Sequence, residues 1–141
     1  MKNKGFTLIE LLVVISIIAV LSIIGISTYQ GIQAKTRDSV RKRDLNNLAT
    51  ALEIYFQRSD KGNGKYKKGN DTCQPVDDNF YNDLSSSSES APKDPQTGSF
   101  YCYISNTDGS SYTLCAKLEN PDPGNPAPSS CTGYNYGLVP K

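Results

Sequence analysis

An apolar run near the amino terminus constrains this chain more than any other feature. Of the 21 residues in 6–26, 16 are apolar, and Glu10 carries the only charge. A helix rises about 1.5 Å per residue and a bilayer core needs about 20 apolar residues, so the run is long enough to span a membrane. A carboxylate near the centre of a spanning helix costs about 2.5–3.5 kcal/mol. We therefore expect a membrane helix in which a partner compensates Glu10.

A removable secretory signal is the first alternative for such a start. It too has a basic leader followed by an apolar run. Here the run is longer than a typical h-region, and no small-x-small cleavage site follows it. These two differences argue against an ordinary signal peptide.

The helical pattern continues beyond the apolar run. Apolar residues recur at spacings of three and four between positions 45 and 56, which gives one apolar stripe. The stripe consists of Leu45, Leu48, Leu52, Tyr55 and Phe56. No proline occurs before Pro75, and helix-breaking residues follow at 60–64. We expect a nearly continuous helix from about Phe6 to about Arg58, apolar over 6–34 and amphipathic over 35–58.

Charged residues fill the other faces of the amphipathic half. The basic run 35–43 is interrupted by Asp38. We expect this run to form a solvated face or salt bridges between copies of the chain, in preference to a site for phosphates of nucleic acid or lipid.

Residues 59–141 are predicted to form a small β-rich head. Segments 99–104 and 112–118 alternate in character and are separated by turn residues around Asp108-Gly109, which predicts a hairpin. The faces expected to cover the helical stripe carry Phe100, Cys102 and Ile104 on the first strand and Tyr112, Leu114, Ala116 and Leu118 on the second. Segment 77–84 is read as a short helical turn or an ordered loop, and the proline-rich segment 121–130 as an irregular tail.

The cysteines all lie in this head. They are Cys73, Cys102, Cys115 and Cys131. An even number at wide spacings in a small polar domain predicts two disulfides and an oxidising compartment, with reduced structural cysteines as the alternative. Strand parity assigns Cys102 and Cys115 to different faces, which favours Cys73–Cys102 with Cys115–Cys131. The other two connectivities stay open.

The composition argues against an enzyme. Histidine is absent, and so are a nucleophile elbow and a phosphate-binding Gly-Lys-Ser/Thr. The acidic residues at 77–83 lack the spacing of a calcium loop. The net charge of +1 gives no bias toward nucleic acid. We expect no catalytic residue, no cofactor, no metal site and no specific nucleic-acid partner.

The segment Gly5-Phe6-Thr7-Leu8-Ile9-Glu10 at the head of such a helix resembles the class III signal of type IV pilins and pseudopilins. The segment Pro92-Lys93-Asp94-Pro95 before Tyr101-x-Tyr103 is similar to the segment that follows the helix in many Gram-negative major pseudopilins and in small pilins of other bacteria. The resemblance implies an α+β, type IV pilin-like fold, in which a long N-terminal helix packs on a small antiparallel sheet.

The resemblance also implies a life cycle. A prepilin peptidase would cleave after Gly5, remove the leader 1–5 and methylate the new amine of Phe6. The single-pass prepilin would sit in the inner (cytoplasmic) membrane with its head outside the cytoplasm. An assembly ATPase and a platform membrane protein would then extract it into a helical homo-oligomeric filament, a cell-surface pilus or a periplasmic pseudopilus. In that filament Glu10 would pair with a neighbour's N-terminus.

Two alternatives to a pilus subunit remain at this point. One is a pseudopilin of a type II secretion or DNA-uptake (competence) machine. The other is a single-pass membrane-anchored binding protein that never polymerises. The chain departs from the family at Ser27, where many pilins have proline, and in its tail, which lacks the acidic, glycine-rich ending of secretion-type major pseudopilins.

Overall fold

The computed structural model describes residues 5–85 and 88–140, without the side chains of residues 24–28. Residues 1–4 of the predicted leader therefore lie outside the described residues. The chain divides into two compact units, Met1–Lys35 and Thr36–Lys141, which are described separately below.

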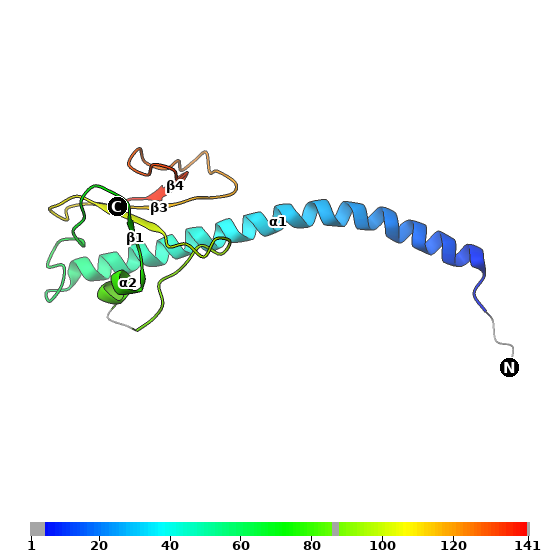
Figure 1. The fold of residues 1–141 in the computed structure, drawn as a ribbon, viewed down its shortest axis with the longest axis horizontal. Helices are drawn as coiled ribbons and strands as arrows, with labels where there is room; N and C mark the ends of the chain where they lie inside the picture. Colours follow the sequence, from blue (N-terminus) through cyan, green and yellow to red (C-terminus); the bar gives the residue numbers. More distant parts are fainter. Residues whose placement is uncertain (1–4, 86–87, 141) are drawn as a thin grey trace. The chain divides into compact units, whose positions relative to one another are not determined.

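The described elements give the α+β fold that the sequence predicts (Figure 1). Helix α1 covers Leu8–Gln57 and α2 covers Asp78–Ser85. The strands are β1 (Gln74–Pro75), β2 (Cys102–Ser105), β3 (Tyr112–Ala116) and β4 (Tyr136–Leu138). The expected helix from about Phe6 to about Arg58 is confirmed to within two residues at each end.

The first unit is the N-terminal part of α1, and its described apolar side chains are exposed. Leu8 is 83% exposed, Ile9 70% and Ile23 72%, and the aliphatic residues between them are also exposed. By length and mean hydropathy, no helix within the described residues qualifies as one that could cross a membrane.

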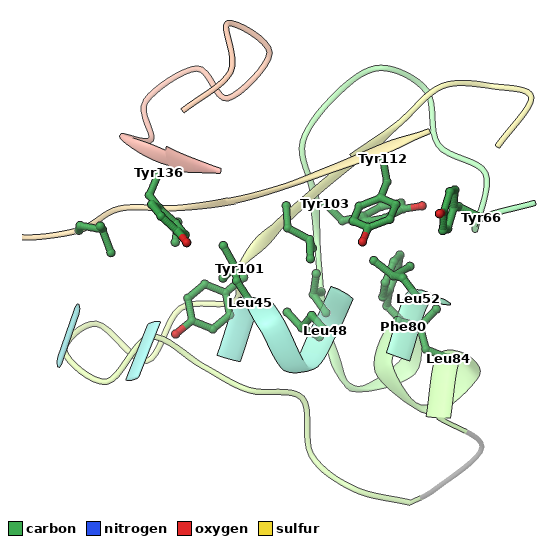
Figure 2. Packing of buried hydrophobic residues seen from close by; sticks show 14 residues of the cluster. Leu45, Leu48, Leu52, Tyr66, Phe80, Leu84, Tyr101, Tyr103, Tyr112 and Tyr136 are labelled. Carbon is green, nitrogen blue, oxygen red and sulfur yellow. The ribbon is translucent and has the colours of Figure 1, made fainter. Parts of the chain in front are cut away.

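The second unit is built around a four-stranded antiparallel sheet with the order β1-β2-β3-β4. The C-terminal half of α1 buries its apolar stripe against this sheet, and Figure 2 shows Leu45 and Leu48 in one cluster with Tyr101 and Tyr103. The stripe residues Leu45, Leu48 and Leu52 are fully buried, which confirms the predicted stripe. The buried cluster consists of Leu45, Leu48, Leu52, Tyr66, Val76, Phe80, Leu84, Tyr101, Tyr103, Tyr112, Leu114, Ala116, Leu118 and Tyr136.

The prediction of which face of the first hairpin strand meets the helix is wrong. Tyr103, and not Cys102 or Ile104, belongs to the core with the helix. Both faces of this strand are apolar or aromatic, so a period of two cannot tell them apart. The hydroxyl of Tyr103 donates to the carbonyl of Lys67 at 2.5 Å.

Three short elements of the head, α2, β1 and β4, are not clearly predicted by the sequence. The segment read as a helical turn or loop is α2, and Asp77 caps it by accepting a hydrogen bond from the Phe80 N–H at 2.8 Å. Strands β1 and β4 have two and three residues, too few to show a period. Strand β4 needs Gly137, because a Cβ there would lie 2.5 Å from Cδ of Pro128.

Candidate functional site

The Gly5–Phe6 peptide bond lies in exposed, non-helical chain just before α1. A Cβ built at Gly5 would meet no atom within 4 Å, and Phe6 is 86% exposed. The helix begins only at Leu8. An enzyme could therefore reach this bond without unwinding a helix.

Thr7 and Glu10 form a capping box at the start of α1. The carboxylate of Glu10 accepts hydrogen bonds at Oε2 from the Thr7 N–H at 2.8 Å and from the Thr7 hydroxyl at 2.7 Å. In return, Thr7 Oγ1 accepts a hydrogen bond from the Glu10 N–H at 3.3 Å. This reciprocal arrangement satisfies two N–H groups that the helix itself cannot pair.

The capping box changes how Glu10 is understood. From the sequence, the Glu10 carboxylate is expected to need a partner from elsewhere, whereas Thr7 of the same chain already binds it. The signal was present, because Thr-x-x-Glu before an apolar run is the sequence pattern of a capping box. Within the described residues, Glu10 makes no ion pair, and its Oε1 accepts no hydrogen bond.

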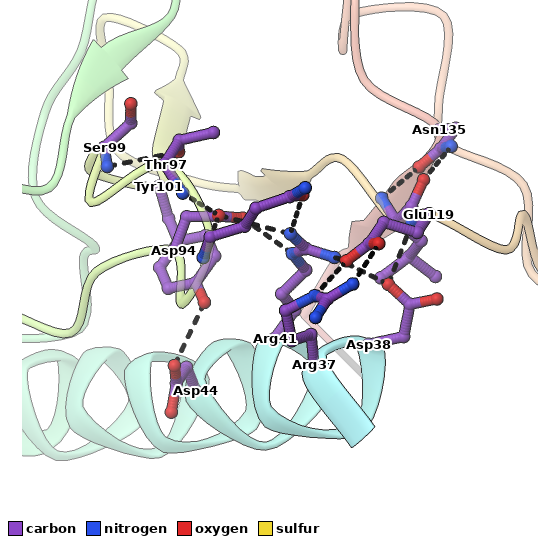
Figure 3. A network of polar contacts seen from close by, with 12 residues as sticks. Arg37, Asp38, Arg41, Asp44, Asp94, Thr97, Ser99, Tyr101, Glu119 and Asn135 are labelled. Atoms are coloured by element: carbon purple, nitrogen blue, oxygen red, sulfur yellow. Dashed lines mark hydrogen bonds and ion pairs between the residues drawn. The ribbon is translucent and has the colours of Figure 1, made fainter. Parts of the chain in front are cut away.

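A second polar centre lies in the head, around the guanidinium of Arg41 (Figure 3). Arg41 is 2% exposed and donates to Asp94 Oδ2 at 2.6 Å, to Asp38 Oδ1 at 2.8 Å and to Glu119 Oε1 at 2.9 Å. The basic run was expected to be solvated or to reach other copies of the chain. For Arg41 that expectation is wrong, because segments distant in sequence cover it.

Asp94 connects Arg41 to a tight turn. Its Oδ1 accepts hydrogen bonds from the backbone N–H groups of Gln96 at 2.9 Å and Thr97 at 2.8 Å. The turn closes where the Asp94 N–H donates to the Ser99 carbonyl at 2.9 Å. The segment that resembles pseudopilins therefore contains the residue that anchors this turn to α1.

Asp38 connects the same centre to the chain after β3. Its carboxylate accepts hydrogen bonds from the backbone N–H groups of Glu119 and Asn120, both at 2.8 Å. On the other side of this segment, Asn135 donates to the Leu118 carbonyl at 2.8 Å and accepts from the Leu118 N–H at 2.6 Å. The chain at 118–120 is thus held between α1 and the C-terminal region.

The network lowers the pKa values of its carboxyl groups. Hydrogen bonds from Arg37 first, and then from Arg41, lower the pKa of Glu119 to about 2. Burial alone would raise the pKa of Asp94, but the hydrogen bonds from Arg41, Thr97 and Gln96 outweigh it and bring the pKa well below the usual range. These acids are therefore ionised at neutral pH and contribute stability in that form.

The four cysteines pair as Cys73–Cys102 and Cys115–Cys131. These are the pairs that the sequence favours, but the parity argument for them is wrong. Cys102 and Cys115 are direct partners in the β2–β3 register and therefore share one face. Within residues 5–85 and 88–140, no group of three or more metal-ligating side chains comes together.

Residues 1–26 match the prokaryotic N-terminal methylation motif. The motif is the class III signal of type IV pilins and pseudopilins, as the N-terminal resemblance indicates. It supports a type IV pilin- or pseudopilin-like prepilin, and it is the motif of a membrane-anchored chain. No curated protein and no solved structure matches the chain.

The methylation motif contains every residue of the N-terminal site. Gly5, Phe6, Thr7 and Glu10 all lie within it. The motif implies processing by a prepilin peptidase and filament assembly, and it is a motif of pilin-type structural proteins. The Arg41 network lies outside the matched residues, so its role follows from the geometry of the head alone.

We expect Thr7→Val to loosen the first turn of α1. Valine has nearly the size of threonine but lacks the hydroxyl that donates to the Glu10 carboxylate and accepts from the Glu10 N–H, and loss of an N-cap costs about 1 kcal/mol. Hydrogen exchange of the first-turn amides in detergent micelles measures the effect. Thr7→Ser is the control, since it keeps the hydroxyl. Equal exchange in Thr7→Val and the unchanged chain would contradict the capping role.

We expect the free energy of unfolding to fall as the pH drops from about 4.5 toward about 2. The pKa of Glu119 is lowered from 4.5 to about 2, so its contribution is fully present above the unfolded value and is lost as it protonates in the folded state. Urea unfolding of the full chain, followed by tyrosine near-UV circular dichroism, measures this.

The matched variants are Glu119→Gln and Glu89→Gln. The first removes the group that titrates and should show a weaker acid dependence, while Glu89 is an exposed glutamate outside the network. An unchanged acid dependence in Glu119→Gln would show that Glu119 does not contribute in this way.

Proposed function

We propose that this chain is a prepilin whose processed form is a structural subunit of a type IV pilus-like filament. The observation that carries the proposal is the methylation motif over residues 1–26, with its cleavable Gly5–Phe6 bond exposed ahead of α1. The α+β head behind the helix agrees with such a subunit.

Processing comes first in the proposed life cycle. Cleavage after Gly5 removes the leader 1–5 and leaves Phe6 with a free amine, which the prepilin peptidase methylates. The exposed, non-helical chain around this bond supports access by the peptidase. The new positive charge then lies one residue before Thr7, the cap of α1.

The apolar half of the helix, 6–34, is proposed to serve first as a membrane span and then as the filament core. Its described apolar side chains are exposed in the single chain, for example Leu12 at 52% and Leu21 at 61%. Burying apolar surface contributes about 25 cal/mol per Å², so neighbouring helices gain by packing against one another. An assembly ATPase and a platform membrane protein supply the extraction from the inner membrane, and the head lies outside the cytoplasm.

Glu10 is proposed to guide assembly by pairing with the Phe6 amine of a neighbouring subunit. Thr7 occupies Oε2, while Oε1 accepts no hydrogen bond from the described residues. A carboxylate in apolar surroundings is costly unless an opposite charge reaches it, so the pairing rewards only subunits that meet in register. Glu10 would thus keep its capping bonds and gain an intermolecular partner.

We expect a prepilin peptidase to convert the full chain into a species that begins with N-methylated Phe6. Co-expression with a peptidase followed by intact-mass measurement tests this. Gly5→Leu is the control, because it puts a bulky side chain beside the bond to be cut and should leave the chain uncut. A chain that keeps Met1 in the presence of active peptidase would exclude the prepilin assignment.

We expect Glu10→Ala and Glu10→Gln to be cleaved normally but to be lost from filaments. Both variants remove the negative charge that attracts the neighbour's amine, and Gln keeps the size of the side chain. The measurement is the fraction of processed subunit in sheared fibres. Normal incorporation of both variants would reject the pairing.

Abundant surface fibres would favour a pilus over a secretion or competence pseudopilus, and absence of any fibre would favour a non-polymerising membrane anchor.

A further inference from the structure

The two disulfides of the head lie next to each other on one face of the sheet. Cys102 of β2 and Cys115 of β3 are direct register partners, on the face away from the helix. Cys102, Cys115 and Cys131 belong to one buried cluster with Ile104. Two separate bridges, from Cys73 to Cys102 and from Cys115 to Cys131, therefore meet at the hairpin.

Solvent can reach only one end of this arrangement. Cys73 is exposed, whereas Cys102 is 1% exposed, Cys115 0% and Cys131 4%. Of the four cysteines, Cys73 is therefore the one that a thiol from outside can approach, and its Sγ lies 3.7 Å from the Tyr134 hydroxyl. Access decides which sulfur of a disulfide is attacked.

The hairpin offers a third disulfide that the folded chain does not use. Residues directly opposite in an antiparallel pair have Cβ atoms about 4.5–5.5 Å apart, and their Cα separation falls within the range of a disulfide. Cys102 and Cys115 are 13 positions apart, compared with separations of 16 and 29 for the native bridges. The unused pairing closes the shortest loop, and the two facing Cβ atoms need to approach by only about 1 Å to reach disulfide geometry.

We propose that Cys73 is a site of attack by an external thiol, and that this attack transfers a disulfide to Cys102–Cys115 and releases Cys131. In the first step a thiolate attacks Sγ of Cys73. A mixed disulfide forms there, the Cys73–Cys102 bond breaks, and the electron pair leaves on Sγ of Cys102. The partner is a thiol, either a small molecule or a protein dithiol.

In the second step the Cys102 thiolate attacks Sγ of Cys115. The Cys102–Cys115 bond forms, the Cys115–Cys131 bond breaks, and Cys131 leaves as a thiolate that takes a proton from water. The number of disulfides is unchanged at each step, so no oxidant is needed. The attack joins facing residues of a formed hairpin, which gives it the advantage of an intramolecular reaction.

Release of Cys131 would break the disulfide that attaches the C-terminal segment to β3. That segment keeps the hydrogen bonds between Asn135 and Leu118 and the 2.6 Å ion pair between Lys42 and Asp122. It loses the bond that holds Cys131 over Gly137, where a Cβ would lie 3.3 Å from its sulfur. Attack at the exposed Cys73 would therefore remove the covalent attachment of the C-terminal segment at Cys131.

Three single variants of the full chain in detergent micelles test the proposal by disulfide mapping after acid quench and alkylation. Cys73→Ser leaves Cys102 as a thiol, and we expect most molecules to carry Cys102–Cys115 with Cys131 alkylated. Cys131→Ser leaves Cys115 as a thiol and should reach the same bridge with Cys73 alkylated. Cys102→Ser is the matched control, which has lost the shared cysteine and should keep Cys115–Cys131.

The unchanged chain supplies a second measurement, which does not depend on how the variants fold. Incubation with reduced glutathione should place glutathione on Cys73 first and make Cys131 the cysteine that becomes open to alkylation. A Cys73→Ser chain that keeps Cys115–Cys131 with Cys102 alkylated would overturn the transfer. Glutathione appearing first on Cys115 or Cys131 would overturn Cys73 as the site of attack.

Discussion

The buried guanidinium of Arg41 is the contact on which the arrangement of the head depends. It joins α1 to the turn at Asp94 and to the chain after β3 through Glu119, and neither segment has enough regular structure to fix its own position. A buried ion pair is weak evidence for net stability, because desolvation offsets much of the attraction. The carboxylates of Asp38, Asp94 and Glu119 meet at this one cation, so the contact ties both segments to a defined position on α1.

The size of the head explains why it relies on such contacts. The second unit has 106 residues, and its described part contains four short strands and two helical segments. A domain of this size buries a smaller share of its surface than a large one, so crosslinks and specific polar contacts matter more. The helix-facing side of the sheet is closed by tyrosines and leucines, and the opposite side by the cysteine cluster with Ile104. The disulfides therefore occupy the face that no helix covers.

The sequence predicts those features that repeat or carry a strong local pattern. The helix and its apolar stripe have many residues, so their period is clear, and the central hairpin carries a strong turn signal at Asp108-Gly109. The face of β2 could not be predicted, because Tyr101 and Tyr103 alternate with equally apolar neighbours. The disulfide pairs were favoured for a reason that the register of Cys102 and Cys115 contradicts. The burial of Arg41 could not be inferred, because its partners Asp94 and Glu119 are 53 and 78 positions away.

Glu10 has one partner within its own chain and, in the proposed filament, a second partner in a neighbouring subunit. Its position in the signal suggests a partner in another subunit, whereas Thr7 of the same chain already donates two hydrogen bonds to its carboxylate in the capping box. The two contacts are compatible, since a carboxylate has two oxygens and several acceptor positions. A capped Glu10 is held at the helix start with one oxygen turned to its own backbone, which limits the conformations that the other oxygen can take. In the proposed filament, a neighbour's amine would then meet a carboxylate that is already oriented, and less conformational entropy would be lost when the two subunits join.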